Sequence, residues 1–138
     1  MKKYINTLML LAVLLSAASI FSSCTKEQEK DTPVIEEGYV RHVILWTLSE
    51  ELSPEEKLDV ISYAKSSMET FERDIPDLVK AEVIFEKRLD SSNCDFMFDM
   101  YFTSRKALEE FSINPDHLAV VAKLKPFIAG RTYLDVML

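Results

Sequence analysis

The segment Tyr-Val-Arg-His-Val-Ile-Leu-Trp-Thr-Leu, at residues 39–48, decides how the rest of the chain can fold. β-branched and aromatic residues dominate it, and their alternation with a period of two predicts a β-strand. One face of this strand would carry Val40, His42, Ile44, Trp46 and Leu48. The other would carry Arg41, Val43, Leu45 and Thr47. The first face is the more apolar, so we expect helices to cover it.

The segments that follow predict a β-α-β-β-α-β order. A capping box at residues 53–56, with proline at the first helical position, indicates the start of a long helix that ends before Pro76. Its apolar stripe would consist of Leu58, Ile61, Ala64, Met68, Phe71 and Ile75. Gly130 suits the exit from the last helical turn. The predicted elements are strands at 39–48, 79–87, 94–102 and 132–138, a helix at 54–75, and helical pieces at 105–111 and 115–128.

This order is typical of a ferredoxin-like α+β sandwich, in which helices cover one face of an antiparallel four-stranded sheet. In the last strand we expect Thr132, Leu134, Val136 and Leu138 to face the helices. The opposite sheet face would hold large apolar side chains, namely Val43, Leu45, Ile84, Met97, Tyr101, Tyr133 and Met137. Among them lie the charged residues Arg41, Glu82, Asp95, Asp99 and Asp135.

A sheet face exposed only to water would not gather so many large apolar side chains. We therefore expect a second copy of the sheet to cover it in a homodimer. The alternatives are a monomer with an apolar sheet face and a monomer whose own tether covers that face.

The amino-terminal residues have the layout of a secretory signal: Lys2 and Lys3, an apolar run at 8–15, and small residues behind it. Residues 21–24, Phe-Ser-Ser-Cys, resemble the lipobox of bacterial lipoproteins, whose cysteine is lipidated and becomes the new terminus. We expect residues 1–23 to be a signal peptide, Cys24 to be lipidated, and residues 24–38 to form a polar tether. The protein would then be anchored by lipid to a membrane of the cell envelope, in the periplasm or at the cell surface. An ordinary signal peptide that contains Cys24 is the alternative.

Composition limits the possible functions. The chain has 138 residues, enough for one domain, and its net charge of −7 argues against nucleic acid as a partner. Gly38 and Gly130 are its only glycines, so it cannot build a glycine-rich phosphate loop. Lipidation of Cys24 would leave Cys94 as the only thiol and exclude an internal disulfide.

A second decisive segment is Asn114-Pro115-Asp116-His117. Asn114 can cap a helix that begins at Pro115, which places His117 in the first turn. The helix dipole disfavours imidazolium there, so the ring of His117 should be neutral and able to accept a proton. The only other histidine is His42. A helix packed on the first strand would bring the two rings face to face across a pocket.

The Arg-His pair at 41–42, the Ile-Pro at 75–76, the Asn-Pro-Asp-His segment at 114–117 and the final strand with Asp135 together resemble the stress-responsive A/B barrel (Dabb) family of dimeric α/β barrels. The resemblance covers nearly all of residues 39–138. It implies a homodimer whose sheets pack face to face into a barrel, and a cavity between each sheet and its helices. Some members of that family are cofactor-free polyketide cyclases whose two facing histidines match His42 and His117. Phe111 stands where the cyclases have a tyrosine.

Three functions follow as hypotheses. The chain is a lipid-anchored module that binds a small apolar or aromatic molecule in a cavity lined by His42, Trp46, Phe111 and His117. Alternatively, it is a cofactor-free enzyme, cyclase-like or monooxygenase-like, with His117 as general base and His42 binding the oxyanion. The third is a structural homodimer without a ligand. We expect no metal or other cofactor, because Asp116 and His117 point in directions about 100° apart on their helix.

Overall fold

The computed structural model describes residues 33–138. The predicted signal peptide at 1–23, the lipidation site Cys24 and most of the tether lie outside this part. Residues 33–138 form one compact unit, which contains the strands, helices and core that the structure describes. Because this unit has its own hydrophobic core, we expect it to fold on its own. No helix in it combines the length and the apolar character needed to cross a membrane.

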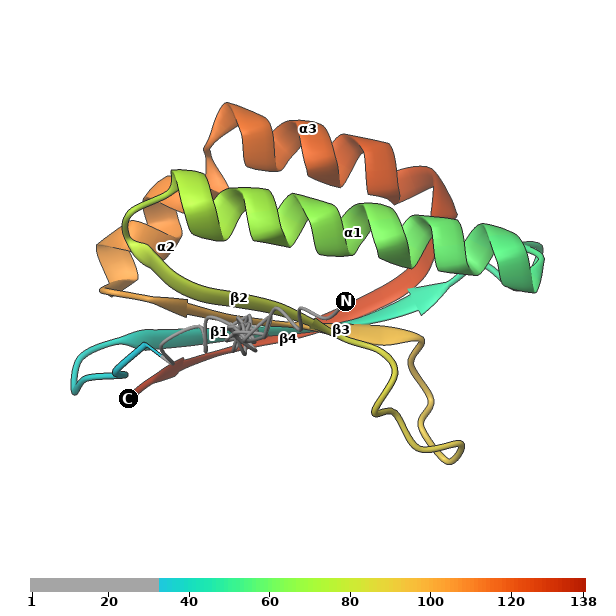
Figure 1. Ribbon diagram of the computed structural model, residues 1–138, viewed down its shortest axis with the longest axis horizontal. Helices are drawn as coiled ribbons and strands as arrows, with labels where there is room; N and C mark the ends of the chain where they lie inside the picture. The colour runs from blue at the N-terminus through green and yellow to red at the C-terminus, as the bar shows by residue number, and fades with distance from the viewer. Residues whose placement is uncertain (1–32) are drawn as a thin grey trace, which may run out of the picture. The chain divides into compact units, whose positions relative to one another are not determined.

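The element order agrees with the sequence prediction. The elements are β1 (Val40–Leu48), α1 (Pro54–Asp74), β2 (Leu78–Ile84), β3 (Phe96–Phe102), α2 (Arg105–Ser112), α3 (Pro115–Leu124), the 3₁₀ turn η1 (Lys125–Phe127) and β4 (Ile128–Met137). The strands form one antiparallel sheet in the order β2-β3-β1-β4. Helices α1 and α3 lie on the same side of the sheet (Figure 1). The ferredoxin-like α+β fold is therefore confirmed.

The predicted helix starts are confirmed by their hydrogen bonds. Ser53 and Glu56 form the reciprocal capping box at the start of α1. The side-chain oxygen of Asn114 accepts from the backbone N–H groups of Asp116 and His117, at 2.8 and 3.3 Å. These bonds satisfy amide donors that have no partner inside the helix. They fix where His117 stands relative to the sheet.

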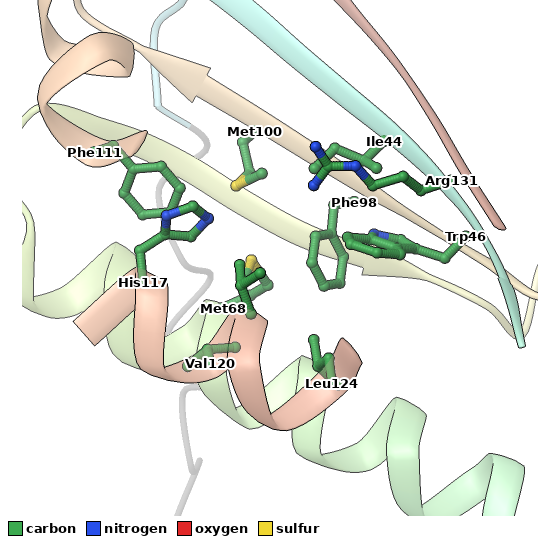
Figure 2. Close-up of a pocket in the computed structure, with 11 residues that line it drawn as sticks. Ile44, Trp46, Met68, Phe98, Met100, Phe111, His117, Val120, Leu124 and Arg131 are labelled. Atoms are coloured by element: carbon green, nitrogen blue, oxygen red, sulfur yellow. The ribbon is translucent and has the colours of Figure 1, made fainter. Parts of the chain in front are cut away.

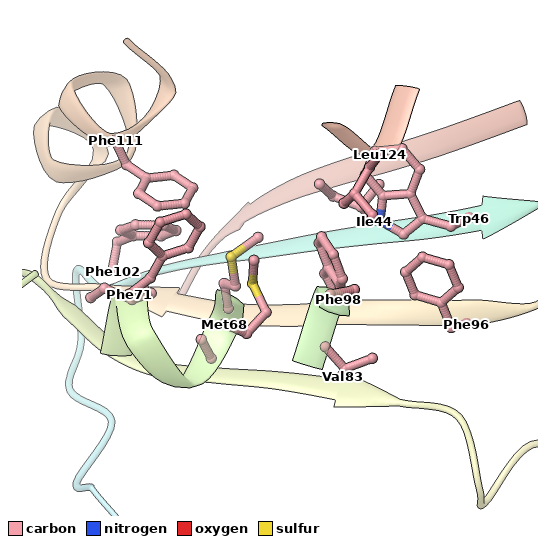
Figure 3. Close-up of a cluster of buried hydrophobic side chains, with 14 of the residues drawn as sticks. Ile44, Trp46, Met68, Phe71, Val83, Phe96, Phe98, Phe102, Phe111 and Leu124 are labelled. Carbon is pink, nitrogen blue, oxygen red and sulfur yellow. The ribbon is translucent and has the colours of Figure 1, made fainter. Parts of the chain in front are cut away.

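The core lies between the sheet and the helices. Buried side chains from the helix-facing sides of β1 and β3 meet those of α1 and α2, with many aromatic rings among them (Figure 3). Leu58, predicted to lie on the buried stripe of α1, is 49% exposed. At about 100° per residue it lies roughly 120° from the centre of that stripe, because the stripe is centred on Ala64 and Phe71. Val60 and Ser67 are buried in its place.

The last strand differs from the prediction in two ways. It begins at Ile128 and includes Gly130, which the sequence had indicated as a helix exit. Its facing is also inverted: His42 pairs with Asp135 and Ile44 pairs with Tyr133, so Asp135, Tyr133 and Met137 lie on the helix side. Thr132, Leu134 and Val136 lie on the open face instead. β4 is an edge strand exposed along most of its length, so the more apolar set of side chains was not a guide to the buried side.

The boundaries of β2 and β3 also shift slightly. The pairing of β2 with β3 is irregular between Leu78 and Lys80, which turns Leu78, rather than the predicted Val79, into the core. β3 begins at Phe96, two residues later than predicted. Neither shift changes which residues of β1 face the helices.

Candidate functional site

His117 stands at the junction of the three helices. Its ring lies 4.3 Å from the ring of Phe111 and 6.4 Å from that of Phe71, measured between centroids. Phe111 comes from α2 and Phe71 from α1, and both are buried. The aromatic contacts hold the imidazole over the sheet.

A small cavity opens beside this ring, between the sheet and the helices (Figure 2). Its volume of about 20 Å³ is enough for about one water molecule. Apolar side chains form most of its wall, and His117 and Arg131 provide charged or ionisable groups. The lining residues are Ile44, Trp46, Met68, Phe98, Met100, Phe111, His117, Val120, Val121, Leu124 and Arg131.

Two buried polar atoms belong to residues that line this cavity. Trp46 Nε1 and His117 Nδ1 are the buried side-chain polar atoms within residues 33–138 that have no hydrogen-bond partner. An unsatisfied buried donor or acceptor costs about 1–3 kcal/mol of folding free energy. Native structures hold few such atoms, and both of these occur at one place.

The pKa of His117 is lowered from the ordinary value of 6.5, so the ring is neutral near pH 7. Burial is the main cause, because it disfavours the charged ring. The backbone carbonyl of Ser112 acts in the opposite direction, and electrostatic repulsion from His42 and Arg131 adds to the lowering. The sequence predicted the neutral form from the helix terminus, whereas desolvation is the larger effect in the structure.

His42 lies on the helix-facing side of β1, as predicted, but outside the lining of this cavity. Its Nδ1 is hydrogen-bonded to the carboxylate of Asp135, and its ring lies 6.1 Å from that of Tyr133. The side chain of His42 is 14% exposed. The structure therefore brings Trp46, Phe111 and His117 to one cavity, with His42 nearby on the same side of the sheet.

Sequence reasoning missed Asp135, Tyr133 and Arg131 as neighbours of this site. All three belong to β4, whose predicted facing was inverted. The signal that could have found them is the pairing register, since Asp135 stands opposite His42 and Arg131 opposite Trp46. Alternation within β4 alone does not supply this register.

A second groove, of about 400 Å³, runs between α1 and α3 on the outer side of the cavity. Val120 and Phe71 border it, and Val120 also lines the inner cavity. Lys123 lies 4.0 Å above the centre of the Tyr63 ring and links the two helices there. Val120 therefore lies between the groove and the cavity.

The open face of the sheet carries a different arrangement. Arg41 donates two hydrogen bonds to Asp99, at 2.8 and 3.0 Å, and its guanidinium lies 5.5 Å from the centre of the Tyr101 ring. Asp99 is buried at 5% exposure. The two residues of the Arg-His pair therefore lie on opposite faces of the sheet. Arg41 lies on the open face and His42 lies on the helix side.

No group of three or more histidine, cysteine, aspartate or glutamate side chains within residues 33–138 is arranged to hold a metal ion. Asp116 is exposed at the start of α3, and Cys94 is a half-buried free thiol. The polar groups that line the cavity are the imidazole of His117, the indole of Trp46 and the guanidinium of Arg131.

Comparison with known proteins places this fold. A dimeric protein of unknown function with a ferredoxin-like fold from Bacteroides fragilis has a TM-score of 0.69 at 22% identity, over 75% of this chain and 100% of that one. A Dabb family protein from Mesorhizobium loti gives 0.60 at 21%, over 74% and 98%. The hydroxynitrile lyase of Passiflora edulis gives 0.60 at 14%, over 75% and 95%. At these identities the likeness shows the fold alone.

No curated protein matches the sequence. The family profile described as Stress Responsive A/B Barrel Domain (Dabb) matches residues 40–138, which is nearly the whole described unit. The profile begins with β1 and ends with the last residue of the chain, so it includes both histidines and all of β4. This chain therefore belongs to the Dabb family.

Proposed function

We propose that this protein is a lipid-anchored homodimer that binds a small, mostly apolar or aromatic molecule between the sheet and the helices, near His117 and His42. The observation that carries the proposal is the meeting of an apolar cavity with two unsatisfied buried polar atoms, on Trp46 and His117. An apolar wall with a few polar groups is typical of small-molecule sites. A ligand with one or two polar atoms would satisfy the groups that the protein leaves unpaired.

The cavity must widen to admit such a ligand, and α3 is the wall best suited to move. Leu124 is the only residue of α3 that is buried, and Leu118 is 50% exposed. Elements with few buried contacts open at a low cost in free energy. Outward movement of Val120 would join the cavity to the groove between α1 and α3. A ligand would then enter the cavity between α1 and α3.

A cofactor-free enzyme is the second candidate, favoured by the neutral ring of His117 and the orientation of His42 by Asp135. A neutral imidazole can accept a proton from carbon next to a carbonyl group. With its Nδ1–H donated to Asp135, the imidazolium form of His42 would donate its Nε2–H to the developing oxyanion. A lyase with this fold is known from Passiflora edulis. Phe111 supplies no hydroxyl, so His42 would be the main group that stabilises the oxyanion.

We assign the dimer interface to the open face of the sheet, because apolar side chains are exposed there. Leu45, Leu134 and Val136 are 38%, 62% and 38% exposed there, around the paired Arg41 and Asp99. A related structure is described as dimeric. Figure 1 shows the loop between β2 and β3 extending on this side of the sheet, opposite the helices. A second sheet would cover the apolar side chains, and the two faces would form a barrel.

The proposal of a lipid anchor is based on the sequence of residues 1–38. The apolar run, the lipobox-like Phe-Ser-Ser-Cys and the charged segment behind it are the layout of a bacterial lipoprotein. A tether of 14 residues after Cys24 is long enough to hold the domain clear of a lipid headgroup layer. Such an anchor would hold the binding cavity in the cell envelope.

The first prediction concerns ligand binding by residues 33–138. In a thermal-shift screen of small aromatic and aliphatic molecules, at least one compound should raise Tm by about 10–15 °C at a hundred times its Kd. His117→Ala and His42→Ala should reduce this shift, while Lys125→Ala, an exposed change on η1, should not. If no compound shifts the unmodified domain, both the binding and the enzyme functions are wrong and the structural homodimer remains.

The second prediction concerns proton abstraction. In D₂O near pD 7, the domain should accelerate deuterium exchange at the methylene of phenylacetone, followed by NMR. His117→Phe should lower the exchange rate by about a hundredfold, because the base is lost while an aromatic ring remains against Phe111. Exchange at the buffer rate with the unmodified domain would rule out His117 as a general base for this class of carbon acid.

The third prediction concerns the dimer. Sedimentation equilibrium should give twice the mass of one chain, and Leu134→Glu should weaken association by about thirtyfold, because a carboxylate would be buried without a partner. Leu58→Glu, an equal charge change on α1, should leave the dimer intact. A monomer in the unmodified protein, or equal effects of both changes, would refute the open face as the interface.

The fourth prediction concerns the anchor. In a bacterial host supplied with labelled palmitate, the full chain should incorporate label and sediment with membranes. Cys24→Ser should abolish both, because serine offers no thiol for the thioether link. Cys94→Ser is the matched control and should change neither. Label that persists in Cys24→Ser would show that Cys24 is not the lipidated residue.

A further inference from the structure

Arg131 differs from the other arginines of the described chain. Arg41, Arg73, Arg88 and Arg105 each lie within 4.0 Å of a carboxylate oxygen. Within residues 33–138 no carboxylate pairs with Arg131. In a chain with a net charge of −7, an arginine left without an acidic partner is unusual. Its position is therefore worth explaining.

The guanidinium of Arg131 stands at the cavity. Figure 2 shows it reaching from β4 toward Ile44 and Met100, across the cavity from His117. It lies 5.9 Å from the centre of the Trp46 ring and 5.7 Å from that of Tyr133. These aromatic faces hold the cation by cation–π attraction while its N–H donors stay free. Arg131 is itself exposed, so its end of the cavity lies close to solvent.

The indole N–H of Trp46 is a second free donor at the same end. It is buried, with Trp46 only 4% exposed, and it has no acceptor within residues 33–138. A carboxylate has two oxygens and can accept hydrogen bonds from an arginine and from a neighbouring N–H together. The rest of the wall, from Met68 to Val120, is apolar and suits a hydrocarbon or an aromatic body.

We propose that the ligand is a small carboxylic acid, bound with its carboxylate between Arg131 and the Trp46 N–H and its apolar part toward His117. This inference rests on the proposed binding function and names the class of ligand. The neutral state of His117 agrees with it, since the inner end of the cavity then offers no second positive charge to compete for the anion. Arg131 would select ligands that carry a negative charge.

Trp46 is the only tryptophan of the chain, so its fluorescence reports directly on the site. The experiment titrates residues 33–138 with two matched pairs of probes, phenylacetate with phenylacetamide and hexanoate with hexanamide. Each pair has the same shape and differs in charge. We expect each acid to bind about tenfold more tightly than its amide. Arg131→Gln should abolish this difference, while Arg73→Gln, an equal charge change at the end of α1, should preserve it.

The outcomes separate this inference from the function on which it rests. Equal binding of acid and amide, or an acid preference that survives Arg131→Gln, would overturn the carboxylate assignment and leave small-molecule binding intact. Binding of no probe, in a protein that also fails the thermal-shift screen, would overturn both. An acid preference lost equally in Arg73→Gln would point to the overall charge and would also refute a specific role for Arg131.

Discussion

The structure depends on covering one side of a four-stranded sheet. β1 and β3 lie at its centre, and their helix-facing side chains, from Ile44 and Trp46 to Phe98 and Phe102, are almost completely buried. Burial of such side chains is the dominant favourable term in folding. The helices that provide it start at fixed points because Ser53, Ser104 and Asn114 cap them. The position of His117 over the sheet is a consequence of the last of these caps.

Much of this could be predicted from the sequence, because the deciding signals are local. The alternation in β1 and β3 and the capping residues act within a few positions of the elements that they define. The side of the sheet on which His42 lies followed from the same alternation. Phe111 was assigned to the cavity through the family resemblance, and the short link between α2 and α3 keeps it close to His117.

The features that were missed depend on contacts between distant segments. Which face β4 presents is set by its register on β1, and the irregular pairing near Thr47 and Leu48 contributes to that register. An edge strand with both sides largely exposed carries little hydrophobic signal to reveal its facing. Asp135 and Tyr133 were therefore assigned to the wrong face, and Arg131 was not assigned to the strand at all. The size of the cavity was also beyond the sequence, because it depends on how closely Met68, Val120 and Leu124 approach one another.

The site lies beneath α3, a helix with one buried side chain, and His117 belongs to both. α3 contributes one buried side chain, Leu124, at its far end, while at its start it is held by the stacking of His117 on Phe111. The imidazole of His117 is thus the titratable group of the cavity. Its contact with Phe111 also helps to hold α3 in place over the cavity. Protonating the ring would oppose its burial and loosen α3, whereas a ligand that packs against the neutral ring would secure it. Opening of the cavity and the charge of His117 are therefore linked through the same contacts.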